Sequence, residues 1–396
     1  MFNPFARIVR ARVLVAGIAA LLVSPQIASS QTAPFEIYGI LPLTGTYAFN
    51  GSAERTSLQI IEDTTNKGGG IGGRPIKFVI LDDASNPFTT VQLTNDLIAK
   101  KVPAIIGSSS SAACAAQLPI VENNGPLTYC LSPSIRPKAG SYVFSACVFV
   151  NDLSAAMLRN FRLRGWKRIA VITSTDATGA LFDQYYDKTV ALPENKSIVT
   201  VAREHFGVTD VSVAAQLEKI RAANPQVIVT WTAGPPFGTL LRGIRDAGLD
   251  LPVASSNADM TYAQMTQYAQ FLPKMLFFPN QAGVSAPVGT GAWRAAQVSY
   301  FNAFKAIGTR PDSASSQSWD PAMLILDGFR HAGLGATAAQ LHDYIENLHG
   351  WTGIYGVYDF RDGSQRGLGG QSAALFQWDA GKNDFALASG PGGSTL

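Results

Sequence analysis

Short apolar runs alternate with amphipathic stretches along most of the chain. The runs are rich in β-branched and aromatic residues and are bounded by glycine, proline or polar residues, which is typical of buried strands. They lie at 35–41, 76–81, 104–106, 127–131, 168–173, 197–203, 226–230 and 251–254. Helical spacing of apolar residues instead marks 52–66, 89–100, 152–164, 211–223 and 236–247. This alternation predicts parallel strands that are covered by helices on both faces.

The pattern changes in the last third of the chain. Successive helices are predicted at 292–307, 315–333 and 337–348, and late strands at 355–360 and 373–378. The glycine-rich residues after Ser389 predict a loose tail. Because the strands are too many for one sheet of modest size, we expect an α/β fold with two doubly wound parallel-sheet lobes.

The first thirty residues have the pattern of a secretory signal peptide. Arg7, Arg10 and Arg12 are their only charged residues, and an apolar run from Val13 to Val23 follows. A basic segment, an apolar run of about ten residues and small residues at the exit are the features of such a peptide. The run is shorter than the roughly twenty residues that a membrane span needs. We expect cleavage after Ser30 and export to the periplasm.

Composition argues against several classes of partner. Without the predicted signal peptide the formal charge falls from +3 to about zero, whereas binding to nucleic acid or anionic lipid needs a basic surplus. Charged residues make up 15% of the chain and hydrophobic residues 46%, which suits a globular protein with a large core. Cys114, Cys130 and Cys147 allow one disulfide in an oxidising compartment and leave one thiol unpaired. The sequence does not select the pair.

Catalytic and metal-binding interpretations are weak throughout. Gly68, Gly70 and Gly73 have dinucleotide-motif spacing, but they follow a helix and precede a strand, the reverse of the order that phosphate binding needs. The serines at 108–111 lack the G-x-S-x-G elbow, and the carboxylates at 82–83 are more common as loop residues. The four histidines lack metal-ligand spacing. We expect a protein that is not an enzyme and that uses no cofactor or metal.

Small hydroxyl residues gather after strands of the first predicted sheet. A polar turn at 44–51 follows the first strand, 107–111 follows the third and leads into a helix, and Ser132 and Ser134 follow the fourth. In doubly wound sheets, ligands lie beyond the carboxyl ends of the strands. Hydroxyls and free N–H groups at a helix N-terminus favour an anion. The sequence therefore predicts a carboxylate-binding site at this edge of the sheet.

Seven segments, collinear along the chain, resemble one known family. They are Ile-Leu-Pro-Leu-Thr-Gly at 40–45, the glycine-rich 66–76, Leu-Asp-Asp-Ala at 81–84, the serine block at 105–111, Ile-Arg-Pro at 135–137, 240–248 and 353–360. Together they resemble the periplasmic solute-binding proteins of the leucine/isoleucine/valine-binding type, which serve ABC transporters. The resemblance covers nearly the whole chain after the predicted signal peptide.

The resemblance implies a type I periplasmic binding protein fold, in which two lobes are joined by three hinge crossings and close over a ligand. The first lobe would span 31–150 with 281–350, and the second 151–280 with 351–396. Closure would report the bound ligand to the permease and ATPase subunits of an ABC importer. We expect a monomeric receptor for a small molecule, with no nucleic-acid partner.

The family's first-lobe site carries over well. Ser111, with Ser110 beside it, matches the family's carboxylate-holding serine before a helix. Ser132 and Ser134 match the second anion-binding loop. The aromatic wall from the first loop would be Tyr47 or Phe49.

The second lobe departs from the family. Thr178 stands where the family has a tyrosine, and Ser256 and Asn257 lie near the position of the acid that pairs with a ligand ammonium group. Asp176 and Asp259 are nearby acids, but neither is at the matching position. Trp231 lies at a strand end, where it is as consistent with a core residue as with a pocket wall.

These departures leave two ligand classes open. Burying an ammonium group without a carboxylate or several acceptors costs several kcal/mol, so an α-amino acid needs a partner in the site. We expect an amino acid of the branched-chain class, as the resemblance implies, with an aromatic or aliphatic carboxylic acid that lacks an amino group as the alternative. A ligand-binding sensor domain of the same fold is the alternative from another class.

Overall fold

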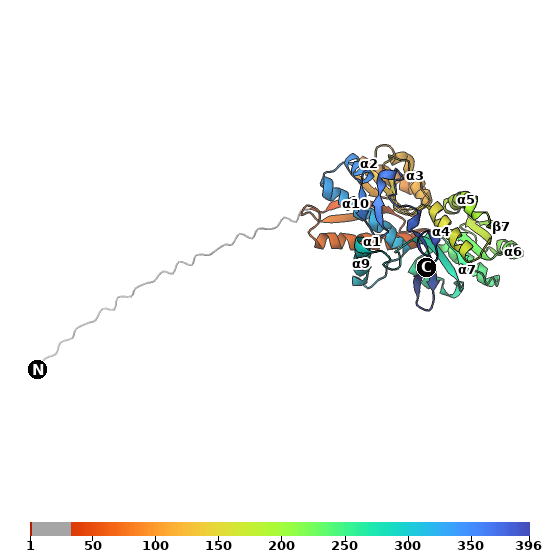
Figure 1. The fold of residues 1–396 in the computed structure, drawn as a ribbon. Coiled ribbons are helices and arrows are strands. Elements are labelled where there is room, and N and C mark those ends of the chain that lie inside the picture. Colours follow the sequence, from red (N-terminus) through yellow and green to blue (C-terminus); the bar gives the residue numbers. More distant parts are fainter. Residues whose placement is uncertain (2–32) are drawn as a thin grey trace. The chain divides into compact units, whose positions relative to one another are not determined.

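Two sheets, each with helices on both faces, organise residues 34–396, which form one unit (Figure 1). The structure is a computed structural model that describes Met1 and residues 33–396. Apart from Met1, the predicted signal peptide therefore lies outside the described residues. No helix of the described residues is long and apolar enough to span a membrane.

Five parallel strands form the sheet of the first lobe, in the order β2-β1-β3-β4-β5. They are β1 (Phe35–Leu41), β2 (Ile76–Asp82), β3 (Ala104–Ile106), β4 (Leu127–Cys130) and β5 (Val143–Ser145). The helices of this lobe are α1 (Ala48–Lys67), α2 (Pro87–Ala99), α3 (Ser111–Val121), α9 (Gly291–Ala306), α10 (Ser313–Ala332) and α11 (Ala338–Glu346). Ile37 of β1 packs in the same core cluster as Leu58 of α1, whereas its neighbour Ile40 packs with Leu97 of α2. Both faces of the strand are therefore buried, as parallel sheets require.

Seven strands form the sheet of the second lobe, in the order β14-β13-β10-β9-β8-β6-β7. They are β6 (Arg168–Ser174), β7 (Val199–Phe206), β8 (Val227–Trp231), β9 (Val253–Ala254), β10 (Leu276–Gln281), β13 (Ala373–Asp379) and β14 (Asp384–Leu387). The helices are α4 (Val150–Leu163), α5 (Ala177–Val190), α6 (Ala214–Ala222), α7 (Pro235–Asp246) and α8 (Tyr262–Gln267). β13 and β14 run antiparallel, which corrects the prediction of a purely parallel sheet. Only four residues separate these two strands, too few for a parallel crossover.

The chain passes between the two sheets three times. It leaves the first sheet after β5, returns to it after β10 to form α9–α11, and crosses again before β13. A two-stranded antiparallel ribbon, β11 (His349–Thr352) with β12 (Val357–Asp359), precedes the last crossing. The residue limits of the two lobes stay a prediction.

Two local predictions are wrong. The predicted turn at 44–51 ends earlier, because α1 begins at Ala48. The predicted loose tail is packed: Ser389 is fully buried, and the short helix Pro391–Gly393 lies against α4. A Cβ on Gly393 would lie 1.9 Å from the carbonyl oxygen of Ala156, so only glycine allows this approach.

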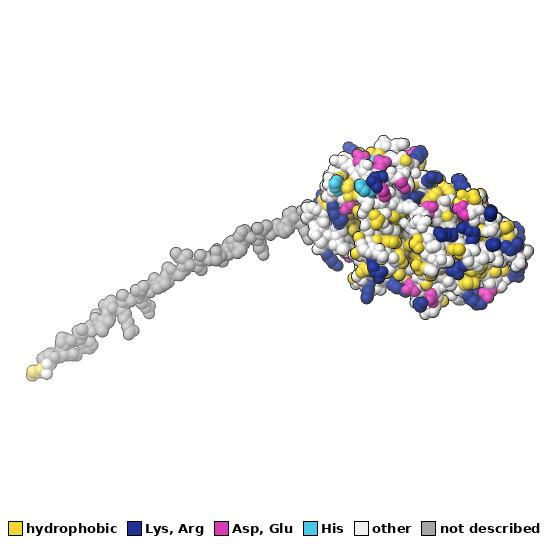
Figure 2. Space-filling model, viewed as in Figure 1, with side chains coloured by type: hydrophobic (Ala, Val, Ile, Leu, Met, Phe, Trp, Pro, Cys, Tyr) yellow, Lys and Arg dark blue, Asp and Glu magenta, His cyan; other side chains and the backbone are white. Residues whose placement is uncertain are grey.

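Exposed ion pairs within each lobe contribute little to stability. On the face in view, basic and acidic side chains are interspersed with uncharged ones (Figure 2). In the ion pairs Lys138–Glu122 and Lys274–Asp250 the lysines are 75% and 81% exposed. Such pairs contribute about 0–1 kcal/mol each. The buried cores on both faces of the two sheets are therefore the main source of stability.

Candidate ligand-binding site

A small cavity lies at the carboxyl ends of β1, β3 and β4, where the second lobe meets the first. It is lined by Tyr47, Asn50, Ser109, Ser111, Ser132, Pro133, Ser134, Thr178, Trp231, Ser256, Asn257, Ala258 and Gln317. Its volume is about 20 Å³, little more than the roughly 10–15 Å³ that one water molecule needs. The lobes are therefore closed on each other, and a solute the size of an amino acid needs them to separate before it enters.

The serines of the first lobe converge as the sequence predicts. β3 and β4 are neighbours in the sheet, so the loops that follow them lie side by side. The hydroxyl oxygens of Ser111 and Ser132 are 2.9 Å apart, and the backbone N–H of Ser134 donates to the Ser132 hydroxyl at 3.3 Å. Ser111 is also the first residue of α3. Hydroxyls and the N-terminus of a helix therefore share one small region, which suits an anionic group.

A disulfide joins the two elements that carry these serines. Cys114 in the first turn of α3 is bonded to Cys130 at the end of β4, with 5.8 Å between their Cα atoms. The sequence left this pairing open. Cys147 is a buried free thiol that donates to the carbonyl oxygen of Leu131 at 3.1 Å. Burial raises the pKa of Cys147 to about 12, so this thiol stays protonated.

Thr178 and Asn257 form part of the second-lobe wall. The hydroxyl of Tyr47 is hydrogen-bonded to the hydroxyl of Thr178, in the first turn of α5. The amide of Asn50 donates to the carbonyl oxygen of Ala258 at 3.2 Å, next to Asn257 in the short helix Asn257–Asp259. Two contacts between the lobes thus close the cavity. One is made by Tyr47, the N-cap of α1, and the other by Asn50 within α1.

Two further contacts define how closely the lobes approach. Trp231, at the end of β8, is 1% exposed and stacks on Phe182 of α5, with ring centroids 4.1 Å apart. It is both a cavity wall and a core residue of the second lobe. Gly234 has φ +71°, and a Cβ there would lie 2.0 Å from the carbonyl oxygen of Thr46 in the first lobe. Glycine is needed here for both reasons.

Ser110 and Phe49 do not line the cavity. The Ser110 side chain caps α3 by accepting from the N–H of Ala113 at 3.4 Å. Phe49 is half-buried in the first turn of α1, and its neighbour Asn50 lines the cavity instead. α1 begins at Ala48, earlier than predicted, and successive residues of a helix point about 100° apart. Asn50 therefore faces the cavity, and Phe49 points away from it.

Ser109 lies in the predicted loop 107–111 and Ser256 was named beside Asn257, whereas Gln317 was missed. Asn50 had a signal that the sequence reasoning did not use: Asn50, Glu54 and Ser57 follow one another at spacings of four and three, which places three polar residues on one buried face of α1. Gln317 comes from α10, far from the other lining residues in the chain, and no local pattern marks it.

Several cavity atoms have hydrogen-bonding capacity to spare. Among the described residues, Asn50 Oδ1, Ser109 Oγ and Asn257 Nδ2 are buried and have no hydrogen-bond partner. Buried polar groups in proteins are nearly always paired with protein or water. Two acceptor atoms and one amide donor therefore remain for a molecule that enters the cavity.

No acidic side chain lines the cavity. Asp176 caps α5, where it accepts from the N–H of Gly179 and the hydroxyl of Ser174. Asp259 is fully buried, and its carboxylate accepts from Ser255, Ser256 and Gln264. Burial raises the pKa of Asp259 to about 7, against the opposing effect of these donors. Within the described residues, no cluster of His, Cys, Asp and Glu is suited to a metal.

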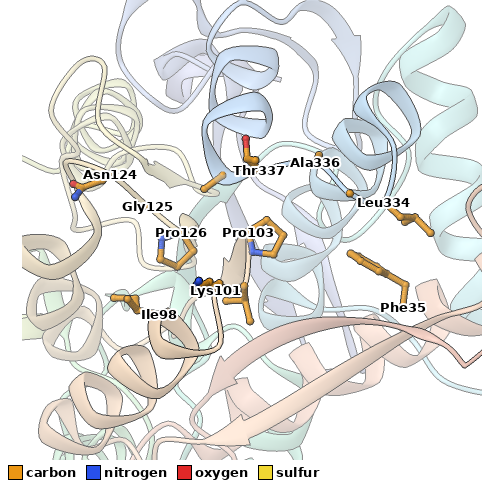
Figure 3. Close-up of a pocket in the computed structure, with 13 residues that line it drawn as sticks. Phe35, Ile98, Lys101, Pro103, Asn124, Gly125, Pro126, Leu334, Ala336 and Thr337 are labelled. Atoms are coloured by element: carbon orange, nitrogen blue, oxygen red, sulfur yellow. The ribbon is translucent and has the colours of Figure 1, made fainter.

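A larger hollow of about 540 Å³ lies at the opposite edge of the first-lobe sheet (Figure 3). Phe35 begins β1, and Pro103 and Pro126 directly precede β3 and β4, so this hollow is at the amino ends of the strands. Lys101 is its one charged lining residue. Ligands of doubly wound sheets bind at the carboxyl ends, which favours the small cavity as the candidate site.

Comparison with known sequences places this site in a family context. Residues 35–383 match the family described as periplasmic binding protein. The chain belongs to the periplasmic binding protein family. A leucine-, isoleucine-, valine-, threonine- and alanine-binding protein from Pseudomonas aeruginosa is 26% identical over 229 residues, which are 56% of this chain and 60% of that protein. Alignments with the first curated relatives thus span about three fifths of their length.

Solved structures of periplasmic binding proteins share the fold. The branched-chain amino acid transporter substrate-binding protein LivJ from Streptococcus pneumoniae, in complex with isoleucine, matches 89% of this chain and 99% of its own, with a TM-score of 0.74 and 18% identity. An ABC transporter solute-binding protein from Rhodopseudomonas palustris, in complex with benzoate, matches 92% and 97%, with a TM-score of 0.74 and 19% identity. The predicted type I fold with two α/β lobes is confirmed.

Proposed function

We propose that this periplasmic binding protein is an extracytoplasmic solute receptor of an ABC importer, and that it binds a small carboxylate-bearing ligand between its lobes. The serine cluster carries the proposal: Ser111 begins α3, its hydroxyl is in contact with that of Ser132, and Ser134 lies beside them. The first N–H groups of a helix have no intrahelical acceptor, and the helix dipole favours negative charge there. A ligand carboxylate would replace the hydroxyl–hydroxyl contact with charge-assisted hydrogen bonds.

Delivery rather than turnover is the activity that this lining supports. It offers hydroxyls, amides and aromatic rings, whereas a hydrolase would pair a nucleophile with a base. The relatives are named as binding proteins, which agrees with this proposal. Closure of the second lobe over the ligand would present a different surface to the permease and ATPase subunits. The predicted signal peptide supports a periplasmic location.

The first candidate ligand class is the branched-chain amino acids. It is supported by the names of the curated relatives and by the isoleucine complex of the S. pneumoniae protein. In this chain the ammonium group would have to rely on neutral acceptors, of which Asn50 Oδ1 and Ser109 Oγ have no other partner.

The second candidate class is aromatic or aliphatic acids without an amino group. The observation that favours it is a lining with no charged side chain, because an ammonium group buried there would lack a counter-charge. The benzoate complex of the R. palustris protein has the same TM-score as the isoleucine complex, so likeness of fold does not separate the two classes.

Isothermal titration with matched ligands tests both the carboxylate site and the choice between the two ligand classes. The pairs are L-leucine with 4-methylpentanoate and L-phenylalanine with 3-phenylpropionate, which differ only in the amino group, together with benzoate. Leucinamide and benzamide are the controls, because they keep the body of the ligand and lose the carboxylate. We expect one member of each pair and neither amide to bind. Equally tight binding of acids and amides would contradict the carboxylate site.

A further inference from the structure

We infer that Glu54, buried behind the cavity, is held as a neutral carboxylic acid that acts through Ser109 to position the hydroxyls that receive the ligand's carboxylate. The site would then bind acids only while Glu54 keeps its proton. This inference rests on the proposed function, since it concerns the same carboxylate site. It makes Glu54 a positioning residue that does not itself contact the ligand.

The geometry around Glu54 is unusual for a carboxyl group. Glu54 is 0% exposed, and neither of its side-chain oxygens has a hydrogen-bond partner of normal geometry. Ser109, whose hydroxyl is also without a partner of normal geometry, is near enough to Glu54 to lower its pKa, and it lines the cavity as well. Asn50 and Ser57 lie on the same buried face of α1, and each also has an unpaired oxygen. A polar path therefore leads from the cavity into the first lobe.

The groups that face Glu54 oppose its ionisation. Burial raises the pKa of Glu54 to about 8, and the nearby Ser109 hydroxyl offsets only part of this effect. Asp83, after β2, and Asp312, before α10, raise the pKa further by charge repulsion. Cys147, after β5, is the other titratable group that interacts with Glu54, and it is a protonated thiol. Glu54 is therefore mostly neutral at neutral pH.

The protonation state of Glu54 decides to which group the Ser109 hydroxyl can donate its hydrogen. A neutral Glu54 donates its proton to the Ser109 oxygen, which leaves the Ser109 hydrogen free to donate into the cavity. An ionised Glu54 instead accepts the Ser109 hydrogen and places a negative charge behind an anion site. Both effects weaken the binding of a carboxylate, so affinity should fall as the pH rises through the pKa of Glu54.

The protonation half of the inference can be tested without ligand. Carbon-13 NMR of labelled side-chain carboxyls, with the Glu54 signal assigned from the Glu54→Gln variant, should show Glu54 titrating near pH 8. Ser109→Ala should move this titration to higher pH, because the Ser109 hydroxyl lowers the pKa. The inference would be overturned if the Glu54 signal titrated in the range of exposed carboxyls. It would also be overturned if Ser109→Ala left the pH of this titration unchanged.

The binding half is tested by the pH profile of affinity for benzoate, or for the tightest acid of the matched panel. If only the protonated form binds, the apparent affinity should fall about tenfold between pH 7 and pH 9. Glu54→Gln keeps a donor but has no ionisable proton, so its affinity should fall much less between pH 7 and pH 9, where Asp259, with a pKa of about 7, is the other buried acid next to a lining residue that still titrates. Asp63→Asn, at an exposed position on the same helix, should keep the slope of the unsubstituted protein.

Four outcomes would contradict the binding half. A flat profile in the unsubstituted protein, or an equal slope in Glu54→Gln, would show that Glu54 does not control the site. An affinity that rises with pH and loses this rise in Glu54→Gln would mean that ionised Glu54 pairs with a cationic ligand group. If no acid of the panel binds at any pH while Glu54 still titrates near pH 8, the proposed function as a carboxylate receptor is wrong. The binding half of this inference is then wrong as well, while the protonation half stands.

Discussion

The two walls of the cavity are built in different ways. The first-lobe wall is a set of serines on adjacent loops, in contact with one another and joined by the Cys114–Cys130 disulfide. The second-lobe wall consists of Thr178, Trp231 and residues 256–258, from three separate strand ends, and Trp231 also belongs to the hydrophobic core. A wall whose donors are held in place before binding suits recognition, because little ordering is needed when the ligand arrives. The second-lobe wall suits a cover that closes over the bound ligand. Three variants test this division.

The largest effect should come from Trp231→Ala. The ring is 1% exposed and stacked on Phe182, so its removal leaves a cavity in the second-lobe core. We expect a loss of about 3–5 kcal/mol in the free energy of unfolding, measured by urea denaturation. Trp351→Ala, at a partly exposed position on the β11–β12 ribbon, is the control and should cost less. A loss below about 1 kcal/mol for Trp231→Ala would show that Trp231 is only a wall of the cavity.

The next effect should come from the pair Ser111→Ala with Ser134→Ala. Each hydrogen bond to a charged group contributes about 1.5–3 kcal/mol, so losing two should weaken ligand binding by about 100-fold to 10,000-fold, measured by isothermal titration. The melting temperature should change little, because these hydroxyls face the cavity. Ser154→Ala removes a buried hydroxyl of α4, away from the cavity, and should leave affinity as it is. Unchanged affinity in the pair would show that the first-lobe wall does not recognise the ligand.

The smallest effect should come from Thr178→Val, which removes the hydroxyl that pairs with Tyr47 across the lobes. A buried hydrogen bond contributes about 1 kcal/mol net, so the ratio of closed to open protein should fall about fivefold. Small-angle X-ray scattering of the ligand-free protein should report a larger radius of gyration. Thr200→Val removes a hydroxyl bonded to Tyr186 within the second lobe and should leave the radius unchanged. Equal radii for the two variants would show that the Tyr47–Thr178 contact does not hold the lobes closed.

Strands with a clear hydrophobic pattern were predictable, and those without one were not. β1 and β3 have the predicted limits, because each is a β-rich apolar run flanked by proline or glycine. β10 was missed, because Pro279, Asn280 and Gln281 interrupt its apolar run. It is nevertheless fully buried, since β9 and β13 flank it. Tertiary packing thus makes a strand where local propensity is poor.

The sequence alone determined the serines of the candidate site in the first lobe, Ser111, Ser132 and Ser134. Their hydroxyls lie within a few residues of a strand end and a helix start, and such short-range relations can be read along the chain. The tertiary structure decided the rest: the Cys114–Cys130 pairing, the meeting of Tyr47 with Thr178, and the burial of Glu54 behind Ser109. These contacts depend on strand order and on lobe closure. Both bring together residues that can be more than a hundred positions apart, and no local sequence pattern encodes such distances.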